Sequence, residues 1–201
     1  RNDTIKTAQT YQKQAEESII KKDFNNSVDD FNLAVGEYDK LHIKSRGIIG
    51  FFRGAKGKNK NTDEKIKEVK DKIEITEKLK KAFQDINEGN QLFNAGDYDQ
   101  ASRKYQAAKF TLEQNTYKRD ELNTDEILVI LNTRIDAVPK LMEAKSLEKT
   151  GDEAIARSDF GTAKSKYDDA INIYLTNGKA DYVINLERKI EDISEQQQTA
   201  Y

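Results

Sequence analysis

The 201-residue sequence contains no cysteine, one histidine, one proline and ten glycines. Without cysteine the chain has no disulfide, no thiol nucleophile and no thiolate metal ligand. His42 alone cannot build a histidine metal site or a Ser-His-Asp hydrolase, so we expect a solvated loop histidine. The sequence also contains no calcium-binding loop and no phosphate-binding loop. These absences predict a protein that is not an enzyme and that holds no metal or cofactor.

Long apolar runs and an excess of one charge are also missing. No stretch approaches the roughly twenty apolar residues of a membrane-spanning helix, and no signal peptide is visible. The formal net charge is −2, which provides no general attraction for nucleic acid and argues against it as a partner. Because Arg1 falls partway through a repeat unit, we expect the sequence to be a soluble fragment of a longer protein.

One segment of the sequence occurs three times. It reads KDFNNSVDDFNLA from Lys22, GDYDQASRKYQAA from Gly96 and SDFGTAKSKYDDA from Ser158. In each copy an aromatic, a small residue, a second aromatic and an alanine follow at spacings of three, four and three, which is one face of an α-helix. These positions are Phe24, Ser27, Phe31 and Ala34, then Tyr98, Ala101, Tyr105 and Ala108, and finally Phe160, Ala163, Tyr167 and Ala170. We expect the three faces to pack in the same way.

The repeated segment resembles the second helix of a tetratricopeptide repeat (TPR), with the Gly-Asp-Tyr turn that precedes it. The small residue that the family places near the middle of its first helix is matched by Ala15, Gly89 and Gly151. The copies lie 74 and 62 residues apart, which is longer than the family's period and predicts extra helices between the pairs. The resemblance covers about half of the chain and implies a scaffold that binds other proteins.

We therefore predict an all-α fold, a TPR-like α-solenoid of about eight antiparallel helices with long fused helices in a right-handed stack. Residues 1–201 are expected to form one domain, with units at roughly 1–60, 61–122 and 123–176 and a capping helix at 178–197. A first long helix should begin near Asn61, where Thr62 or Asp63 would cap it. In the second long helix, Pro139 predicts a kink or break after Val138.

Residues 42–60 form the one segment that does not recur, and the helix before it is expected to end near Leu41. The segment contains six basic residues and no acidic one. The residues that could dock on a partner protein or an anionic membrane are Arg46, Ile48, Ile49, Phe51, Phe52 and Arg53. The same residues could stack on nucleic acid, which ranks lower. The alternative, which we favour, is a flap whose four apolar side chains cover the core between units.

The first helices of TPR pairs line a concave surface, so the resemblance implies a partner-binding face along them. The matching positions are Ile19, Ile20, Phe83, Ile86, Asn90, Phe93, Asn94, Asp152 and Ile155. Asn90 matches an asparagine that family members use to hold a peptide carboxylate, but the basic residues that complete that clamp are missing from the matching places. For Phe83, Ile86 and Phe93 the alternative is packing in the core. The remaining surface would suit a helix or an extended peptide.

These features predict a non-enzymatic interaction or scaffold module that binds a protein or peptide on its concave face. The Lys, Asn, Ile and Asp bias is typical of an AT-rich genome and suggests a bacterial protein, of which this would be the soluble regulatory or extracytoplasmic part. The absence of cysteine fits an extracytoplasmic location of a membrane-associated protein, with the cytoplasm as the alternative. The rival function is membrane-surface or anionic-polymer binding through residues 42–60, with the repeats as a spacer. Self-association through the long helix is a third possibility, so a monomer and a weak homodimer are both compatible with the sequence.

Overall fold

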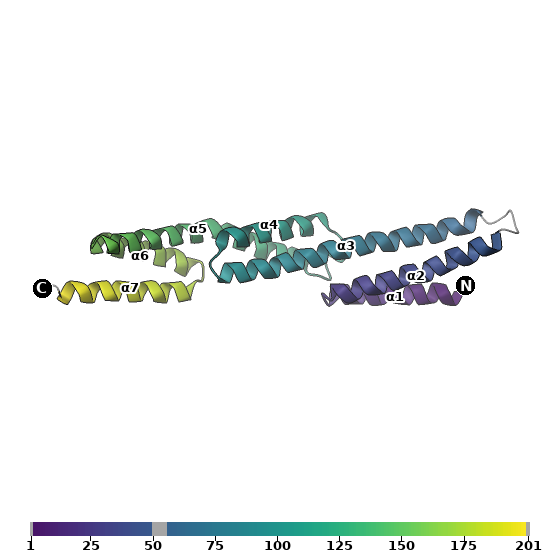
Figure 1. The fold of residues 1–201 in the computed structure, drawn as a ribbon, viewed down its shortest axis with the longest axis horizontal. Helices are drawn as coiled ribbons and strands as arrows, with labels where there is room; N and C mark the ends of the chain where they lie inside the picture. The colour runs from purple at the N-terminus through teal and green to yellow at the C-terminus, as the bar shows by residue number, and fades with distance from the viewer. Residues whose placement is uncertain (1, 50–55, 200–201) are drawn as a thin grey trace. The chain divides into compact units, whose positions relative to one another are not determined.

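A computed structural model of the chain describes residues 2–49 and 56–199, without the side chains of residues 42–49, 56–60 and 199. Seven helices make up nearly all of this described part, which contains no strand (Figure 1). The helices are α1 (Asn2–Ile20), α2 (Phe24–Ile49), α3 (Lys56–Asn94), α4 (Tyr98–Gln114), α5 (Thr124–Ala156), α6 (Phe160–Thr176) and α7 (Ala180–Thr199). The predicted all-α class is confirmed.

The contacts within the chain divide it into two compact units. The first unit comprises residues 1–87 and 107–128, and the second comprises residues 88–106 and 129–201. In the first unit α1 packs along α2, and in the second unit α6 packs along α7. Helices α3, α4 and α5 each contribute residues to both units.

The repeated aromatic and alanine face is buried in α2, α4 and α6, except that Phe160 is half-buried. The second aromatics, Phe31, Tyr105 and Tyr167, are all essentially inaccessible to solvent. The small residues before them and the alanines after them are fully buried as well. Each face continues for one more turn, to Tyr38, Leu112 and Tyr174, which are also buried. The three equally spaced faces therefore occupy the same kind of environment, because their side chains point into the core at the same helical positions.

Two glycines allow the tyrosine rings to lie directly against the backbone of the preceding helix. A Cβ atom at Gly89 would lie 2.7 Å from the Tyr105 ring, and one at Gly151 would lie 2.4 Å from the Tyr167 ring. Ala15, which is fully buried, stands at the matching position of the first copy. In the second and third copies, the small residue noted in the sequence is therefore the place where the first helix of the pair meets the ring from the second helix.

The same turn joins the two helices of each pair. Lys22, Gly96 and Ser158 adopt left-handed backbone conformations, with φ values of 60°, 78° and 60°. An aspartate follows each of them and donates its backbone N–H to a carbonyl five residues earlier, at 2.9 Å in every copy. Its carboxylate accepts a hydrogen bond from the backbone N–H three residues later, as a helix N-cap does. These aspartates are Asp23, Asp97 and Asp159.

The prediction that the first copy's second helix ends near Leu41 is wrong, because α2 continues to Ile49. The expected start of the long helix near Asn61 is also wrong, because α3 begins at Lys56 and is 39 residues long. His42 therefore lies within a helix and not in a loop. Between Leu41 and Ile49 the sequence has no proline and a single glycine, so little in it opposes a continuing helix.

The predicted break at Pro139 does not occur, since α5 is one helix that contains this proline. A proline inside a helix costs about 3 kcal/mol. Here Leu131 and Val138 before it and Leu141 and Ala144 after it are all buried. Their burial on one face offsets that cost, and Pro139 itself is exposed. The unbroken helix explains why the described residues form seven helices where about eight were expected.

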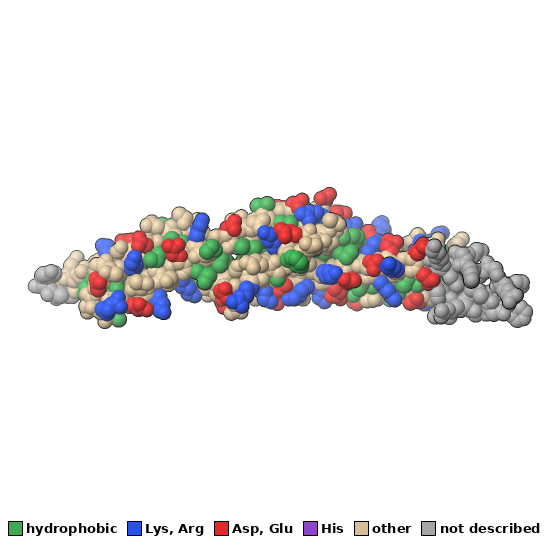
Figure 2. All heavy atoms as spheres, turned by 90° about the horizontal axis from the view of Figure 1, so that it is seen from above, with side chains coloured by type: hydrophobic (Ala, Val, Ile, Leu, Met, Phe, Trp, Pro, Cys, Tyr) green, Lys and Arg blue, Asp and Glu red, His purple; other side chains and the backbone are tan. Residues whose placement is uncertain are grey.

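Charges of both signs are mixed on the surface. On the face drawn in Figure 2, basic and acidic side chains alternate, and apolar side chains appear in small separate areas. No extended area of one charge sign is present among the side chains coloured there. Within residues 2–49 and 56–199, no helix is long and apolar enough to span a membrane.

Candidate partner-binding groove

One polar residue follows the small residue in the first helix of each pair, and a cation from a later helix reaches it. In the first copy Lys72 Nζ of α3 donates to Glu16 Oε1 at 3.0 Å. In the second copy Arg134 Nη1 of α5 donates to Asn90 Oδ1. In the third copy Lys189 Nζ of α7 donates to Asp152 Oδ1 at 2.7 Å. We call these contacts the first, second and third polar clusters.

The ring from the second helix completes the second and third clusters. Tyr105 Oη donates to Asn90 Oδ1 at 2.9 Å, and Tyr167 Oη donates to Asp152 Oδ1 at 2.6 Å. The matching ring of the first copy is Phe31, which has no hydroxyl group. The clusters therefore share one backbone arrangement and differ in their hydrogen-bonding side chains.

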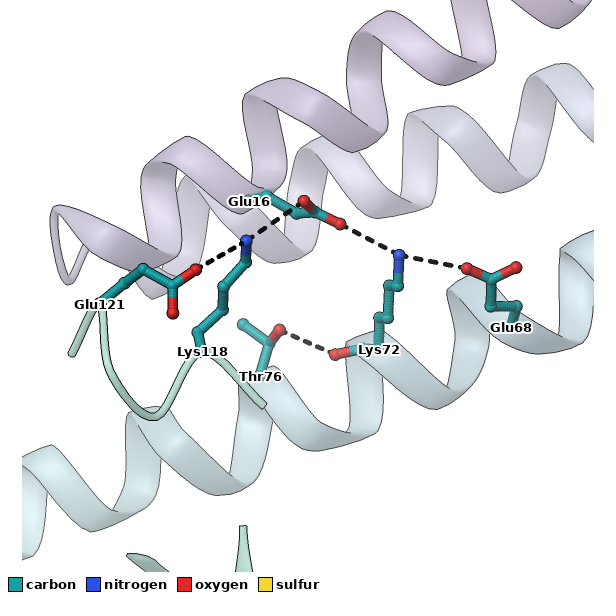
Figure 3. Close-up of polar contacts among 6 residues, drawn as sticks. All are labelled: Glu16, Glu68, Lys72, Thr76, Lys118 and Glu121. Carbon is teal, nitrogen blue, oxygen red and sulfur yellow. Dashed lines mark hydrogen bonds and ion pairs between the residues drawn. The ribbon is translucent and has the colours of Figure 1, made fainter. Parts of the chain in front are cut away.

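The first polar cluster is an ion-pair network (Figure 3). Glu16 lies between Lys72 and Lys118, whose Nζ is 3.4 Å from Glu16 Oε2. Lys72 also pairs with Glu68 at 3.2 Å, and Lys118 pairs with Glu121 at 3.4 Å. Burial alone would raise the pKa of Glu16, but the hydrogen bond from Lys72 and the charges of both lysines outweigh it and hold the pKa below its usual value. Both oxygens of Glu16 are thus used inside the protein.

The second polar cluster is covered by another cation. Lys179 Nζ lies 4.0 Å from the centre of the Phe93 ring and donates to the Phe93 carbonyl at 3.1 Å. Arg134 lies 5.7 Å from the same ring centre. Burial and the nearby Arg134 charge lower the pKa of Lys179. Phe93 is therefore a packing partner for two cations inside the second unit.

The third polar cluster opens into a groove of about 310 Å³, the α5–α7 groove. It is lined by Asp152 and Ile155 of α5, Tyr167 of α6, and Lys189, Asp192, Ile193 and Gln196 of α7. The Asp152 side chain is 51% exposed, whereas its counterpart Glu16 is 31% exposed. Lys189 is 37% exposed, whereas Lys72 is 20% exposed. The third cluster is thus the more open to solvent.

The groove presents two carboxylates, Asp152 and Asp192, and one cation, Lys189, beside apolar surface. Burial would raise the pKa of Asp152, but hydrogen bonds from Lys189 and Tyr167 hold it below its usual value, so the carboxylate is ionised at neutral pH. Ile155 and Ile193 supply the apolar part. Apolar surface with a few oriented polar groups is typical of a binding site. Across the described part of the chain, no group of three or more His, Cys, Asp or Glu side chains is placed to hold a metal ion.

Two of the nine residues predicted for the concave face, Asp152 and Ile155, line this groove. Ile19 is fully buried in the first unit, and Ile20 beside it is exposed. Asn94 is the exposed last residue of α3. These three do not line the groove.

The other four predicted residues, Phe83, Ile86, Asn90 and Phe93, are half-buried. The Phe83 ring lies 5.2 Å from that of Phe24, and the Phe93 ring lies 5.4 Å from that of Tyr98. The alternative of core packing therefore describes both phenylalanines. The Asn90 carbonyl oxygen accepts from Tyr105 and Arg134, so it is occupied within the chain.

The residues predicted to dock through the 42–60 segment fall outside what the structure describes. Phe51, Phe52 and Arg53 lie outside the described residues, as do the side chains of Arg46, Ile48 and Ile49. Contact of this segment with a partner or a membrane stays a prediction, and so does the flap.

Sequence reasoning missed the α7 side of the groove, because α7 was expected to be a cap. It also assigned Tyr167 only to the core. A signal was present, since Lys72 and Arg134 are 62 residues apart, which is the repeat period of the second and third copies. That match marks the helix after each pair as part of the repeated unit.

No protein-family model, curated protein or solved structure matches the chain. The TPR resemblance therefore depends on the residues of the three copies alone. Any conclusion about function depends on the geometry of the groove and on the repeated contacts around it.

Proposed function

We propose that this chain is a non-enzymatic protein-interaction module, a TPR-like helical scaffold that binds a protein or peptide in the α5–α7 groove. The repeated buried faces, the shared turn and the close contacts at Gly89 and Gly151 support a stack of equivalent helix pairs. The observation that carries the binding function is the open groove, where the ionised Asp152 and Lys189 lie beside Ile155 and Tyr167.

A library of phage-displayed 12-residue peptides, selected on the full chain, tests this proposal. We expect binders that lose at least tenfold in affinity on Ile155→Glu, which places a charge on the apolar part of the groove. Asp192→Arg, on the exposed rim, should weaken the same peptides without touching the core. The matched control is Ile184→Glu, because Ile184 is an apolar residue of α7 that is 53% exposed and does not line the groove.

Circular dichroism should show that all three variants keep their helical content. A library that yields no binder would contradict the proposed function. Selected peptides that bind equally well to Ile155→Glu and Asp192→Arg would contradict it as well, because their site would then lie elsewhere.

A further inference from the structure

The surface that matches the α5–α7 groove is filled in the first copy. Glu16 and Ile19 match Asp152 and Ile155 at the repeat spacing. The turn between α4 and α5, residues 115–123, lies against Glu16 and places Lys118 Nζ 3.4 Å from its Oε2 atom. Ile19 is fully buried. The turn that follows α4 therefore occupies this surface (Figure 3).

A turn also lies against the matching surface of the second copy, but its lysine contacts Phe93 and not Asn90. Asn90 and Phe93 are the counterparts of Asp152 and Ile155 there. The turn between α6 and α7 places Lys179 on the Phe93 ring and hydrogen-bonds it to the Phe93 carbonyl. In both copies the occupant is the turn after the second helix of the next copy, and in both it brings a lysine.

The third copy has the same surface without such an occupant among the described residues. On α5, Leu141 follows Arg134 of the second polar cluster and is fully buried. Gln196 holds the matching position after Lys189 on α7, and it is exposed. The exposed Asp152 and Asp192 line the same open groove. The groove is thus the one member of the three matching surfaces that lies open in the described structure.

The hydrogen bonds of Asp152 indicate the charge of the missing occupant. Lys189 and Tyr167 both donate to Oδ1, so neither of these hydrogen bonds uses Oδ2. In the first copy Lys72 binds Oε1 of Glu16, and the second oxygen, Oε2, is where Lys118 binds. Asp152 Oδ2 therefore stands where the first copy receives the lysine of the entering turn. Asp192 adds a second negative charge to the groove.

We infer that the α5–α7 groove receives the turn of a helical hairpin from a partner protein, and that this turn carries a lysine or arginine bound to Asp152 Oδ2. The inference rests on the proposed function and specifies the shape and charge of its ligand. Two such turns already pack on the matching surfaces of this chain, so the groove needs no rearrangement to accept a third.

Two fluorescent peptides from this chain serve as probes for anisotropy titrations against the full protein. One covers residues 108–128 and contains Lys118, and the other covers residues 170–187 and contains Lys179. We expect binding of at least one peptide, weakened at least tenfold by Lys118→Glu or Lys179→Glu in that peptide. Asp152→Asn in the protein should weaken binding at least fivefold. Asp136→Asn, an exposed aspartate of α5 outside the groove, is the matched control and should change nothing.

The two proposals fail differently. If library peptides bind the groove while neither turn peptide binds, the hairpin inference is wrong and the proposed function stands. The inference would also be overturned if the affinity of the turn peptides is unchanged both by the lysine-to-glutamate change in the peptide and by Asp152→Asn in the protein. Light scattering gives a further outcome, because a concentration-dependent dimer that Asp152→Lys abolishes would make a second copy of this chain the occupant, contrary to the partner assigned here.

Discussion

The first and third polar clusters have the same plan and different surroundings. Glu16 and Asp152 each follow a small residue and accept from a lysine of the helix after the pair. Glu16 is enclosed by a further turn with Lys118, whereas Asp152 lines an open groove. The comparison shows that one repeated arrangement serves packing where the next turn is present and leaves an open groove where it is not.

The largest expected effect comes from removing the buried rings of Phe31 and Tyr167, which tests whether the first and third copies are built alike. Phe31→Ala and Tyr167→Ala should each lower the free energy of unfolding by about 3–5 kcal/mol, because each deletes a fully buried ring. Tyr167→Phe keeps the ring and loses only the hydrogen bond to Asp152, so it should cost about 1 kcal/mol. Urea denaturation followed by circular dichroism measures all three. A cost for one alanine variant of less than half the other would show that the two cores are not built alike.

Neutralising the carboxylates should have a smaller and unequal effect. Glu16→Gln leaves Lys72 and Lys118 without their shared partner, and we expect a cost of about 1 kcal/mol after allowance for solvent screening. Asp152→Asn should cost less, about 0.5 kcal/mol, because its ion pair is more exposed. Equal costs in urea denaturation at neutral pH would contradict the difference between the filled and the open surface.

The pH dependence of stability tests the ion pairs of Glu16 in particular. The pKa of Glu16 is lowered in the folded protein, so its contribution is present above its unfolded pKa of about 4.3 and is lost as the pH falls through the folded value. The difference in unfolding free energy between wild type and Glu16→Gln should therefore shrink in acid. A difference that stays constant from pH 7 to pH 3 would show that the cost comes from altered packing and not from charge.

The spacing of aromatic and small residues predicted the fold class and the three buried faces, because helical periodicity is a local property of the chain. Phe31, Tyr105 and Tyr167 could be placed in the core for this reason. Pro139 misled the prediction, because the burial of Leu131 and Leu141 on either side of it is a tertiary effect. The end of α2 was missed because the charged, apolar segment after Leu41 was read as a separate element.

The candidate site was harder to predict than the fold. Asp152 and Ile155 were found through the family resemblance, but Lys189 comes from a helix 37 residues further along the chain. Lys72 and Arg134 keep the 62-residue period, whereas Lys189 follows Arg134 by 55 residues, so the equivalence is hidden in the third copy. Which cation meets which acceptor depends on how helices approach one another, and local spacing does not report that.

The turns between the helices of each pair give a further test, with a small expected effect on stability. Lys22 in the first copy and Ser158 in the third have positive φ values where the second copy has Gly96. Lys22→Gly and Ser158→Gly should each stabilise the protein by about 0.5–1 kcal/mol, because glycine adopts this conformation without a steric penalty. Gly96→Ala is the reverse control and should destabilise, since its Cβ would also lie 2.5 Å from the Tyr182 hydroxyl. Thermal unfolding gives all three values, and a destabilised Ser158→Gly would contradict the shared turn.

The unbroken α5 helix has a consequence for how this protein can change in length. It carries Arg134, which serves the second polar cluster, and Gly151, which receives the Tyr167 ring of the third copy. The two residues are 17 apart. Deleting or inserting one residue between them would rotate one relative to the other by about 100° around the helix axis, so both could not stay in place. Length variation should therefore be tolerated in the connections between helices and selected against between Arg134 and Gly151.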